Sequence, residues 1–376
     1  MSGCRCAGRG AVGLTYQISD QTRFFDLGTD LRVESGTTLT GSRVAYRTWG
    51  DPSNEAILIC HALTGSADAD EWWEGLFGPS RSFDPGRDFI IASNVLGGCY
   101  GTTGPTSTRP GTDVWYGGGF PPVTIRDMVA LQSELLDHLG VDTLRLVIGG
   151  SMGGMQALEW AALQPDRVKG VVAIGVGADH SAWSVAFSEA QRAAIWGDPK
   201  FQGGQYEPGN GPDIGLGVAR MIAMISYRGK ANFESRFARR TVEDEFEVRN
   251  YLRHQGQKLV ERFDANTYLR LMDAMDSHDL ARGRGDLKRA LAGIKTPVLT
   301  VGISSDILYP ASEVEDLASG LPNARYQMLH APQGHDSFLI ETANLDAIVS
   351  RFKNDLARGI TPADDLTSGR GRSAWI

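Results

Sequence analysis

One serine, Ser151, lies among four glycines in the segment GGSMGG at residues 149–154. The apolar run TLRLVI at 143–148 precedes it, and a segment with helical spacing follows it and ends at a proline. In a chain with 46 glycines, a G-x-S-x-G pattern alone is weak evidence. Between a strand and a helix, however, the pattern is typical of a nucleophilic serine on a sharp turn. The alternative is a serine that caps the helix beside packing glycines.

A nucleophilic serine needs a histidine base, and the histidine needs a carboxylate that orients it. When the serine is on such a turn, the acid and then the histidine follow it, at the carboxyl ends of later strands. Asp306 follows the apolar run TPVLTVGI, and His335 follows RYQMLH in a loop where a glycine precedes it. We therefore predict that Ser151, His335 and Asp306 form a catalytic triad. His180 stays an alternative base, although it precedes the acid in the chain.

The tetrahedral intermediate of such a reaction needs two backbone N–H donors, which together form an oxyanion hole. One donor is the residue after the nucleophile, Met152. The other comes from the loop after an earlier strand, and the segment CHALTGS at 60–66 has that place. Our candidate is the N–H of Leu63, and we expect His61 to support this loop rather than to act in catalysis.

The elements that must position these residues follow an α/β pattern. Apolar runs predict strands at 37–49, 55–60, 88–95, 143–148, 170–176, 296–303 and 325–330, and a helix is predicted at 124–139. Between 179 and 295 the chain is helical and charged, and strand-like runs disappear. The prediction is an α/β-hydrolase fold, with a mostly parallel sheet and helices on both faces. Residues 1–178 and 296–376 form the core, and 179–295 form a helical lid insertion.

Composition excludes several classes of partner. Of the 376 residues, 41% are hydrophobic and 22% are charged, and the net charge of -8 argues against binding to nucleic acid. No apolar run is long enough to span a membrane, and the amino terminus lacks the apolar stretch of a secretory signal. The cysteines have no spacing typical of a metal site, so we expect no metal and reduced thiols in the cytoplasm; they are Cys4, Cys6, Cys60 and Cys99.

The sequence resembles the homoserine O-acetyltransferase family of the α/β-hydrolase fold. The similarity extends from about residue 30 to 352, and it is carried by CHALTG, NVLGGCYGTTGPTS, FPPVTIRDMVALQ, GGSMGGMQALEW, GLGVARMIAMISYR, YLRHQGQKLVERFDANTYL, SSDILYP and GHDSFLIE. The resemblance implies that acetyl-CoA acylates Ser151 and that homoserine takes the acetyl group, a step of methionine biosynthesis. It also implies that Arg220 holds the amino acid's carboxylate and that Asp336 holds its ammonium. CoA is then a co-substrate rather than a bound cofactor, and the protein is a homodimer formed through the insertion.

The acyl donor and the acceptor stay open. The loop GCYGTTGPTS has Tyr100 and Thr102 where we expect smaller or serine residues in many members of the family. Relatives with this architecture use succinyl-CoA, or acylate serine instead of homoserine. The alternatives are therefore a homoserine or serine O-succinyltransferase and, with the same triad, a serine esterase. A binding protein without chemistry fits poorly, because every triad position is filled.

Overall fold

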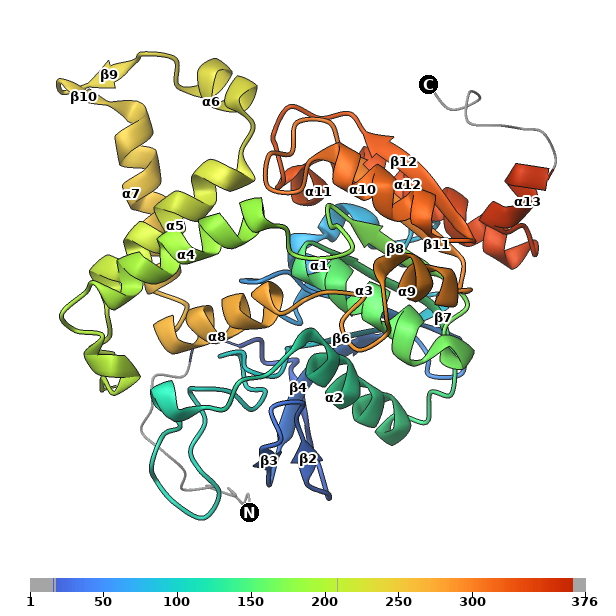
Figure 1. Ribbon diagram of the computed structural model, residues 1–376, viewed down its shortest axis with the longest axis horizontal. Helices are drawn as coiled ribbons and strands as arrows, with labels where there is room; N and C mark the ends of the chain where they lie inside the picture. The colour runs from blue at the N-terminus through green and yellow to red at the C-terminus, as the bar shows by residue number, and fades with distance from the viewer. Residues whose placement is uncertain (1–15, 17, 208, 368–376) are drawn as a thin grey trace, which may run out of the picture.

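An eight-stranded sheet forms the centre of the protein, in the order β1-β4-β6-β5-β7-β8-β11-β12 (Figure 1). The structure is a computed structural model that describes residue 16 and residues 18–207 and 209–367. The strands are β1 (Arg23–Asp26), β4 (Arg43–Trp49), β5 (Glu55–Cys60), β6 (Asp88–Ser93), β7 (Leu144–Gly150), β8 (Val171–Ile174), β11 (Val298–Ile303) and β12 (Ala324–Leu329). The pairs from β6 to β12 are parallel, whereas β4 is antiparallel to both of its neighbours. The predicted mostly parallel sheet is confirmed.

Apolar side chains cover both faces of this sheet, and two buried clusters result. In β5, Ile57 and Ile59 belong to one cluster, and Leu58 and Cys60 belong to the other, as the alternation along a strand requires. The first cluster includes residues of α12 (Thr342–Ala357) and η1 (Glu74–Leu76). The second includes residues of α2 (Ile125–His138), α3 (Met152–Leu163) and α10 (Ala311–Gly320). Helices therefore lie on both faces, as predicted.

The bounds of the predicted elements differ from the observed ones where local side chains decide. The helix predicted at 124–139 begins at Ile125 because Thr124 caps it: the Asp127 N–H donates to the Thr124 hydroxyl, and the Asp127 carboxylate accepts from the Thr124 N–H. The strand predicted at 37–49 is divided at Gly41, which has a φ of 60°. Its first part, β3 (Thr38–Leu39), pairs with β2 (Leu31–Arg32) outside the large sheet.

The insertion is a group of helices between β8 and β11, drawn at the left of Figure 1. It contains α4 (Ala182–Trp196), α5 (Asp213–Tyr227), α6 (Lys230–Arg236), α7 (Glu247–Val260), α8 (Ala265–Asp276) and the hairpin β9 (Thr241–Val242)–β10 (Glu245–Phe246). Its two ends run side by side, because the His180 N–H donates to His278 O and the Leu280 N–H donates to Ala178 O. The insertion therefore ends near residue 280, whereas the sequence predicted that it ends at 295.

The helix that follows this closure packs with the core. It is α9 (Leu287–Gly293), and its Leu291 lies against α10 and belongs to the same buried cluster as Leu317. Other short elements complete the chain: α1 (Ala69–Trp72), α11 (Ser337–Ile340), α13 (Pro362–Thr367), η2 (Gly117–Gly119), η3 (Pro165–Arg167) and η4 (Gln202–Gly204). Within the described ranges, no helix is both long and apolar enough to cross a membrane.

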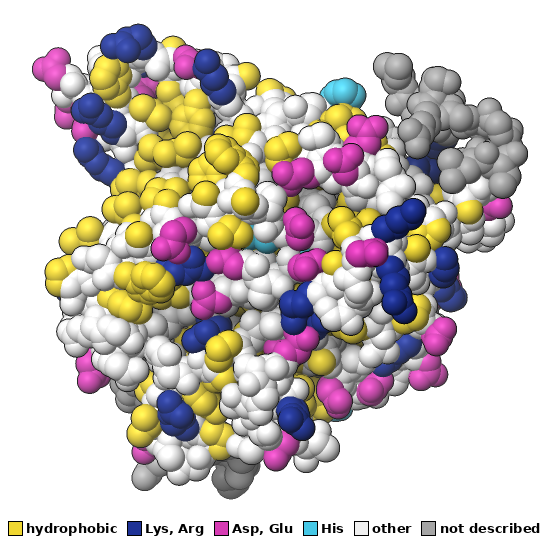
Figure 2. Space-filling model, in the orientation of Figure 1, with side chains coloured by type: hydrophobic (Ala, Val, Ile, Leu, Met, Phe, Trp, Pro, Cys, Tyr) yellow, Lys and Arg dark blue, Asp and Glu magenta, His cyan; other side chains and the backbone are white. Residues whose placement is uncertain are grey.

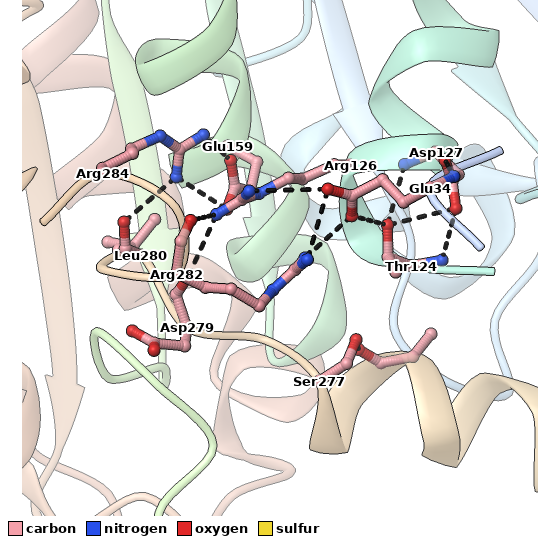
Figure 3. A network of polar contacts seen from close by, with 11 residues as sticks. Glu34, Thr124, Arg126, Asp127, Glu159, Ser277, Asp279, Leu280, Arg282 and Arg284 are labelled. Atoms are coloured by element: carbon pink, nitrogen blue, oxygen red, sulfur yellow. Dashed lines mark hydrogen bonds and ion pairs between the residues drawn. The ribbon is translucent and has the colours of Figure 1, made fainter. Parts of the chain in front are cut away.

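Residues 279–284, where the insertion returns to the core, are joined to α2 and α3 by a network of ion pairs and hydrogen bonds (Figure 3). Glu159 of α3 is 1% exposed, and its carboxylate accepts hydrogen bonds from Arg126 at 3.1 Å and from Arg284 at 2.5 Å. Arg282 pairs with Glu34 at 2.8 Å. A buried carboxylate without these partners would destabilise the fold strongly, so the network holds the return of the insertion in one place. It thereby also fixes α3, the helix that begins directly after Ser151.

Candidate active site

Ser151 occupies the turn between β7 and α3 in a strained backbone conformation. Its φ is 55° and its ψ is -126°, a region that residues with a side chain rarely adopt. The glycines around it allow the close approach that the turn requires, since a Cβ atom on Gly149 or Gly153 would overlap the carbonyl oxygen of Cys60 at the end of β5. A Cβ on Gly150 would overlap the ring of Phe338. The glycine-rich segment is therefore a consequence of close packing around the turn that carries this serine.

The predicted acid and base lie in hydrogen-bonding contact. His335 follows β12 and Asp306 follows β11, and His335 Nδ1 lies 2.6 Å from Asp306 Oδ2. The other carboxylate oxygen, Oδ1, accepts the N–H groups of Leu308 at 2.8 Å and Tyr309 at 3.0 Å. Because a carboxylate only accepts, His335 carries its proton on Nδ1 and has a free lone pair on Nε2. That Nε2 atom is buried and has no hydrogen-bond partner within the described residues.

The surroundings of His335 favour its protonated form. Burial lowers the pKa of His335, but the charge and hydrogen bond of Asp306, together with the charge of Asp336, raise it further than burial lowers it. The rings of Tyr309 and Phe338 pack against the imidazole at centroid distances of 5.5 Å and 5.6 Å. The arrangement suits a group that takes a proton and holds it briefly as an imidazolium.

A cavity of about 610 Å³ brings the predicted side chains together, lined by residues that include Ser151, His335, Arg220, Asp336 and Leu63. Asp306 is outside this lining, behind His335. The insertion contributes Arg220 and Tyr227, both on α5, to this lining. The core contributes Ser151, His335, Asp336 and Leu63. The site is thus formed between the sheet's carboxyl edge and the insertion. Of the alternative bases, His180 is not part of this lining and instead contacts the hydroxyl of Tyr309 at 2.7 Å.

The loop after β5, which carries Leu63, is held in place by hydrogen bonds of Ala62 and His61. The Ala62 carbonyl accepts from the Gly65 N–H at 2.9 Å and lies 2.8 Å from His61 Nδ1. His61 Nε2 accepts from the Val95 N–H at 3.1 Å, so its proton is on Nδ1. Burial lowers the pKa of His61 to about 4, so it is neutral at neutral pH. Since Ala62 O and the Leu63 N–H belong to one trans peptide, the N–H points away from this anchor.

Two charged groups flank the serine–histidine pair. Arg220 is half-buried on α5, lies 5.5 Å from the ring centroid of Tyr227 and forms no ion pair within the described part of the chain. Asp336 follows His335 directly, and its carboxylate lies 3.3 Å from Arg228 Nη2. Burial raises the pKa of Asp336, while the charges of Arg228, Arg220 and His335 oppose the rise. The sequence reading missed Arg228 and Tyr227, although both stand in the segment ISYR that ends α5.

No group of His, Cys, Asp or Glu side chains in the residues that the structure describes is arranged to hold a metal ion. Of the four cysteines, Cys4 and Cys6 lie outside the described residues. Cys60 and Cys99 are buried free thiols.

Known proteins share this fold and much of this sequence. The family model for the α/β hydrolase fold matches residues 55–342. A homoserine O-acetyltransferase of Trichormus variabilis is 53% identical over 351 residues, which cover 92% of this chain and 98% of that protein. The crystal structure of a homoserine O-acetyltransferase from Bacillus anthracis is 25% identical with a TM-score of 0.83, covering 89% of this chain and 97% of that one. An esterase structure has 27% identity and a TM-score of 0.82, covering 88% and 99%. The chain therefore belongs to the homoserine O-acetyltransferase family, whose members are acyltransferases with the α/β hydrolase fold.

Proposed function

We propose that this protein transfers the acetyl group of acetyl-CoA to the hydroxyl of L-homoserine through an acyl-serine intermediate. The observation that carries the proposal is the content of one cavity: Ser151 and His335 share it with a cation, Arg220, and an anion, Asp336. An amino acid has one carboxylate and one ammonium, so these two side chains match its two charges. The 53% identity to a homoserine O-acetyltransferase supports the same substrate.

In the first half-reaction, Ser151 Oγ attacks the thioester carbonyl of the donor while His335 Nε2 takes the hydroxyl proton. The N–H groups of Leu63 and Met152 stabilise the oxyanion of the tetrahedral intermediate. Its collapse breaks the C–S bond, and His335 returns the proton to the leaving thiolate. CoA leaves as a free thiol, so it is a co-substrate, and the acetyl group stays on Ser151 as an ester.

In the second half-reaction, homoserine binds with its carboxylate at Arg220 and its ammonium at Asp336. A guanidinium binds a carboxylate through two parallel hydrogen bonds, which fixes the direction of the side chain. His335 takes the proton of the homoserine hydroxyl, and the oxygen attacks the acyl-serine. The ester bond to Ser151 breaks, and His335 gives the proton back to the serine.

Two groups of alternatives differ in a measurable way. A succinyl donor or a serine acceptor would use the same triad, because neither changes the chemistry at Ser151. An esterase would use water in place of the amino acid. The fold does not distinguish these cases, since the esterase and the acetyltransferase crystal structures match the chain with TM-scores of 0.82 and 0.83. The pair Arg220 and Asp336 favours an amino-acid acceptor over water.

A crossed assay tests the proposal: purified protein with acetyl-CoA or succinyl-CoA, each with homoserine, with serine or without acceptor. With acetyl-CoA alone, we expect a burst of free thiol and then slow hydrolysis, because the site is shielded by the insertion. Adding homoserine is expected to raise thiol release at least about tenfold and to yield O-acetylhomoserine, since a bound hydroxyl oriented toward His335 replaces water, which is not positioned and is partly excluded from the site. Equal steady-state thiol release with and without homoserine, with acetate as the only product, would show an esterase.

Arg220→Ala is expected to weaken use of homoserine and to leave acylation of Ser151 nearly unchanged. Losing a charge-assisted hydrogen bond costs about 1.5–3 kcal/mol, which corresponds to a fall in kcat/KM for homoserine of about 10- to 150-fold. The burst of thiol in the absence of acceptor measures acylation separately. Arg253→Ala, at an exposed arginine of α7 that pairs with Glu245, is the control. A variant with unchanged kinetics for homoserine would remove Arg220 from the substrate site.

We also propose that two copies of the chain associate through the insertion. Exposed apolar side chains follow one face of α5, namely Ile214, Val218 and Ile225, which are 79%, 38% and 47% exposed. Figure 2 shows hydrophobic side chains gathered over the part of the surface where α4, α5 and α7 lie. Apolar patches of this kind mark interaction sites. Sedimentation velocity tests the proposal: a dimer that Ile214→Lys converts to a monomer supports it, and a monomeric unaltered protein contradicts it.

A further inference from the structure

Tyr100 and Arg262 join the insertion to the loop that carries Leu63. Arg262 lies between α7 and α8, and its Nη1 donates to the carbonyl oxygen of Thr64 at 2.9 Å and to the hydroxyl oxygen of Tyr100 at 2.6 Å. The Tyr100 hydroxyl in turn donates to the Arg262 carbonyl at 2.9 Å. The Tyr100 ring also packs edge-on against Phe263 at a centroid distance of 5.8 Å. Two residues that are 162 positions apart are thus joined by two hydrogen bonds, one between their side chains and one from the Tyr100 hydroxyl to the Arg262 backbone carbonyl.

Tyr100 is held firmly on the core side. It is 7% exposed, and its backbone carbonyl accepts from Asn94 Nδ2 at 2.8 Å. The same asparagine accepts the Ala67 N–H at 2.9 Å, at the far end of the loop that follows β5. Burial, as the main cause, raises the pKa of Tyr100 to about 12, so its hydroxyl keeps the proton that it donates. Tyr100 is therefore held in one position between the loop after β5 and the insertion.

Several carbonyl oxygens of the loop after β5 accept hydrogen bonds. Ala62 O is held by Gly65 and His61, and Ser66 O accepts from Trp72 Nε1 at 3.1 Å. These anchors come from the core. Thr64 O, directly after Leu63, is held by Arg262, which belongs to the insertion.

We propose that Arg262 and Tyr100 are positioning residues for the oxyanion hole, through which the insertion sets the orientation of the Leu63 N–H. The inference rests on the proposed function, since it presupposes that Leu63 stabilises an oxyanion during acylation. Arg262 fixes the Thr64–Gly65 peptide, and the Gly65 N–H of that peptide donates to Ala62 O, the carbonyl of the peptide that carries the Leu63 N–H. Tyr100 fixes the guanidinium. Preorganised donors lose much of their effect when they move by a fraction of an ångström, because the transition state then has to reorder them.

A different role for Arg262 is to bind the phosphates of CoA, since the residue lines the cavity. The structure favours positioning. The Nη1 atom already makes two hydrogen bonds to the protein, and the carboxylates of Asp68 and Glu71 line the same cavity. Asp68 pairs with Arg47 at 2.9 Å, so it is mainly the charge of Glu71 that would repel a phosphate nearby.

The test compares acyl donors with and without phosphates. The rate constant for acylation of Ser151 is measured with acetyl-CoA and with S-acetyl-N-acetylcysteamine, which has the thioester but no phosphate. For Tyr100→Phe and Arg262→Met, we expect a fall of about 10- to 100-fold with both donors, because the loss is in the oxyanion hole. The dissociation constant of homoserine is expected to stay unchanged, because Arg220 and Asp336 are not altered. Arg262→Lys, which keeps a single donor for Thr64 O, is expected to recover part of the rate.

Tyr326→Phe is the matched control, since Tyr326 lies on β12, an edge strand of the sheet, and its hydroxyl contacts Ala311 O of α10. Thermal unfolding identifies a variant that fails to fold. If Arg262→Met does not fold, Tyr100→Phe, which keeps the ring packing against Phe263, tests the positioning role by itself. A fall confined to acetyl-CoA and seen in its KM, or unchanged rates in folded variants, would overturn the inference. Unaltered protein that is not acylated at Ser151 by either donor would instead overturn the proposed function.

Discussion

Ser151→Ala is expected to abolish acetyl transfer while the protein stays folded. The serine side chain makes no capping hydrogen bond to α3, so its removal breaks no such contact. The backbone is held by other groups, since the Ser151 N–H donates to Ile174 O at 2.8 Å and the Ser151 carbonyl accepts from the Met155 N–H at 3.1 Å. Without a nucleophile the covalent route is closed, and we expect kcat to fall by at least about three orders of magnitude.

The measurement is the rate of thiol release with homoserine present, together with the intact mass of the protein after exposure to acetyl-CoA alone. The unaltered protein should gain one acetyl group, and the variant should gain none. Ser93→Ala is the control, because the Ser93 hydroxyl is buried in β6 and has no hydrogen-bond partner in the described part of the chain. If Ser151→Ala kept more than about a tenth of the transfer rate, a different residue would be the nucleophile.

The parts of the site that could be predicted from the sequence are those that follow local rules. Ser151, Asp306 and His335 each follow a predicted strand, in the turn or loop after it, and the carboxyl ends of parallel strands meet at one edge of a sheet. Arg220 and Asp336 were taken from a resemblance, and only the structure shows that they share a cavity with Ser151.

The parts that could not be predicted depend on contacts between distant segments. The pairing of Arg228 with Asp336 joins the end of α5 to the loop after β12, and no spacing in the sequence indicates that these two residues are in contact. The contact between Tyr100 and Arg262 is of the same kind. His61 could be placed in a supporting role, but its tautomer follows only from its two partners in the structure.

The fold shows the same division. The buried strand β5 is a continuous apolar run and was predicted with its observed bounds, and the other strands of the parallel part were predicted with bounds shifted by one or two residues. The edge strand β1 was missed because its residues, RFFD, are largely exposed and show no apolar alternation. The end of the insertion was placed at 295 rather than near 280 because α9 has the same helical pattern as the helices before it. Which helix packs on the sheet is decided by tertiary contacts, here those of Leu291.

Asp306→Asn is expected to be almost as damaging as the loss of the serine, for a reason that lies in the hydrogen bonds around the carboxylate. Asp306 Oδ1 accepts two backbone N–H groups, from Leu308 and Tyr309. An asparagine can satisfy both only with its oxygen, so its NH₂ group must face His335. His335 Nδ1 then has to accept, and the imidazole proton moves to Nε2. A protonated Nε2 cannot take the proton of Ser151, and a fall in kcat of about four orders of magnitude follows.

Nitrogen NMR of the histidine ring reads this tautomer directly and separates it from a change in structure. The unaltered protein should show a protonated Nδ1 on neutral His335, and the variant should show a protonated Nε2. The pKa of His335 should also fall, because Asp306 contributes both charge and a hydrogen bond that raise it, whereas burial lowers it. Asp137→Asn is the control, since that carboxylate is largely exposed and pairs with Arg167 on the surface. An Asp306→Asn protein with near-normal kcat, or with the proton still on Nδ1, would show that a different group orients the imidazole.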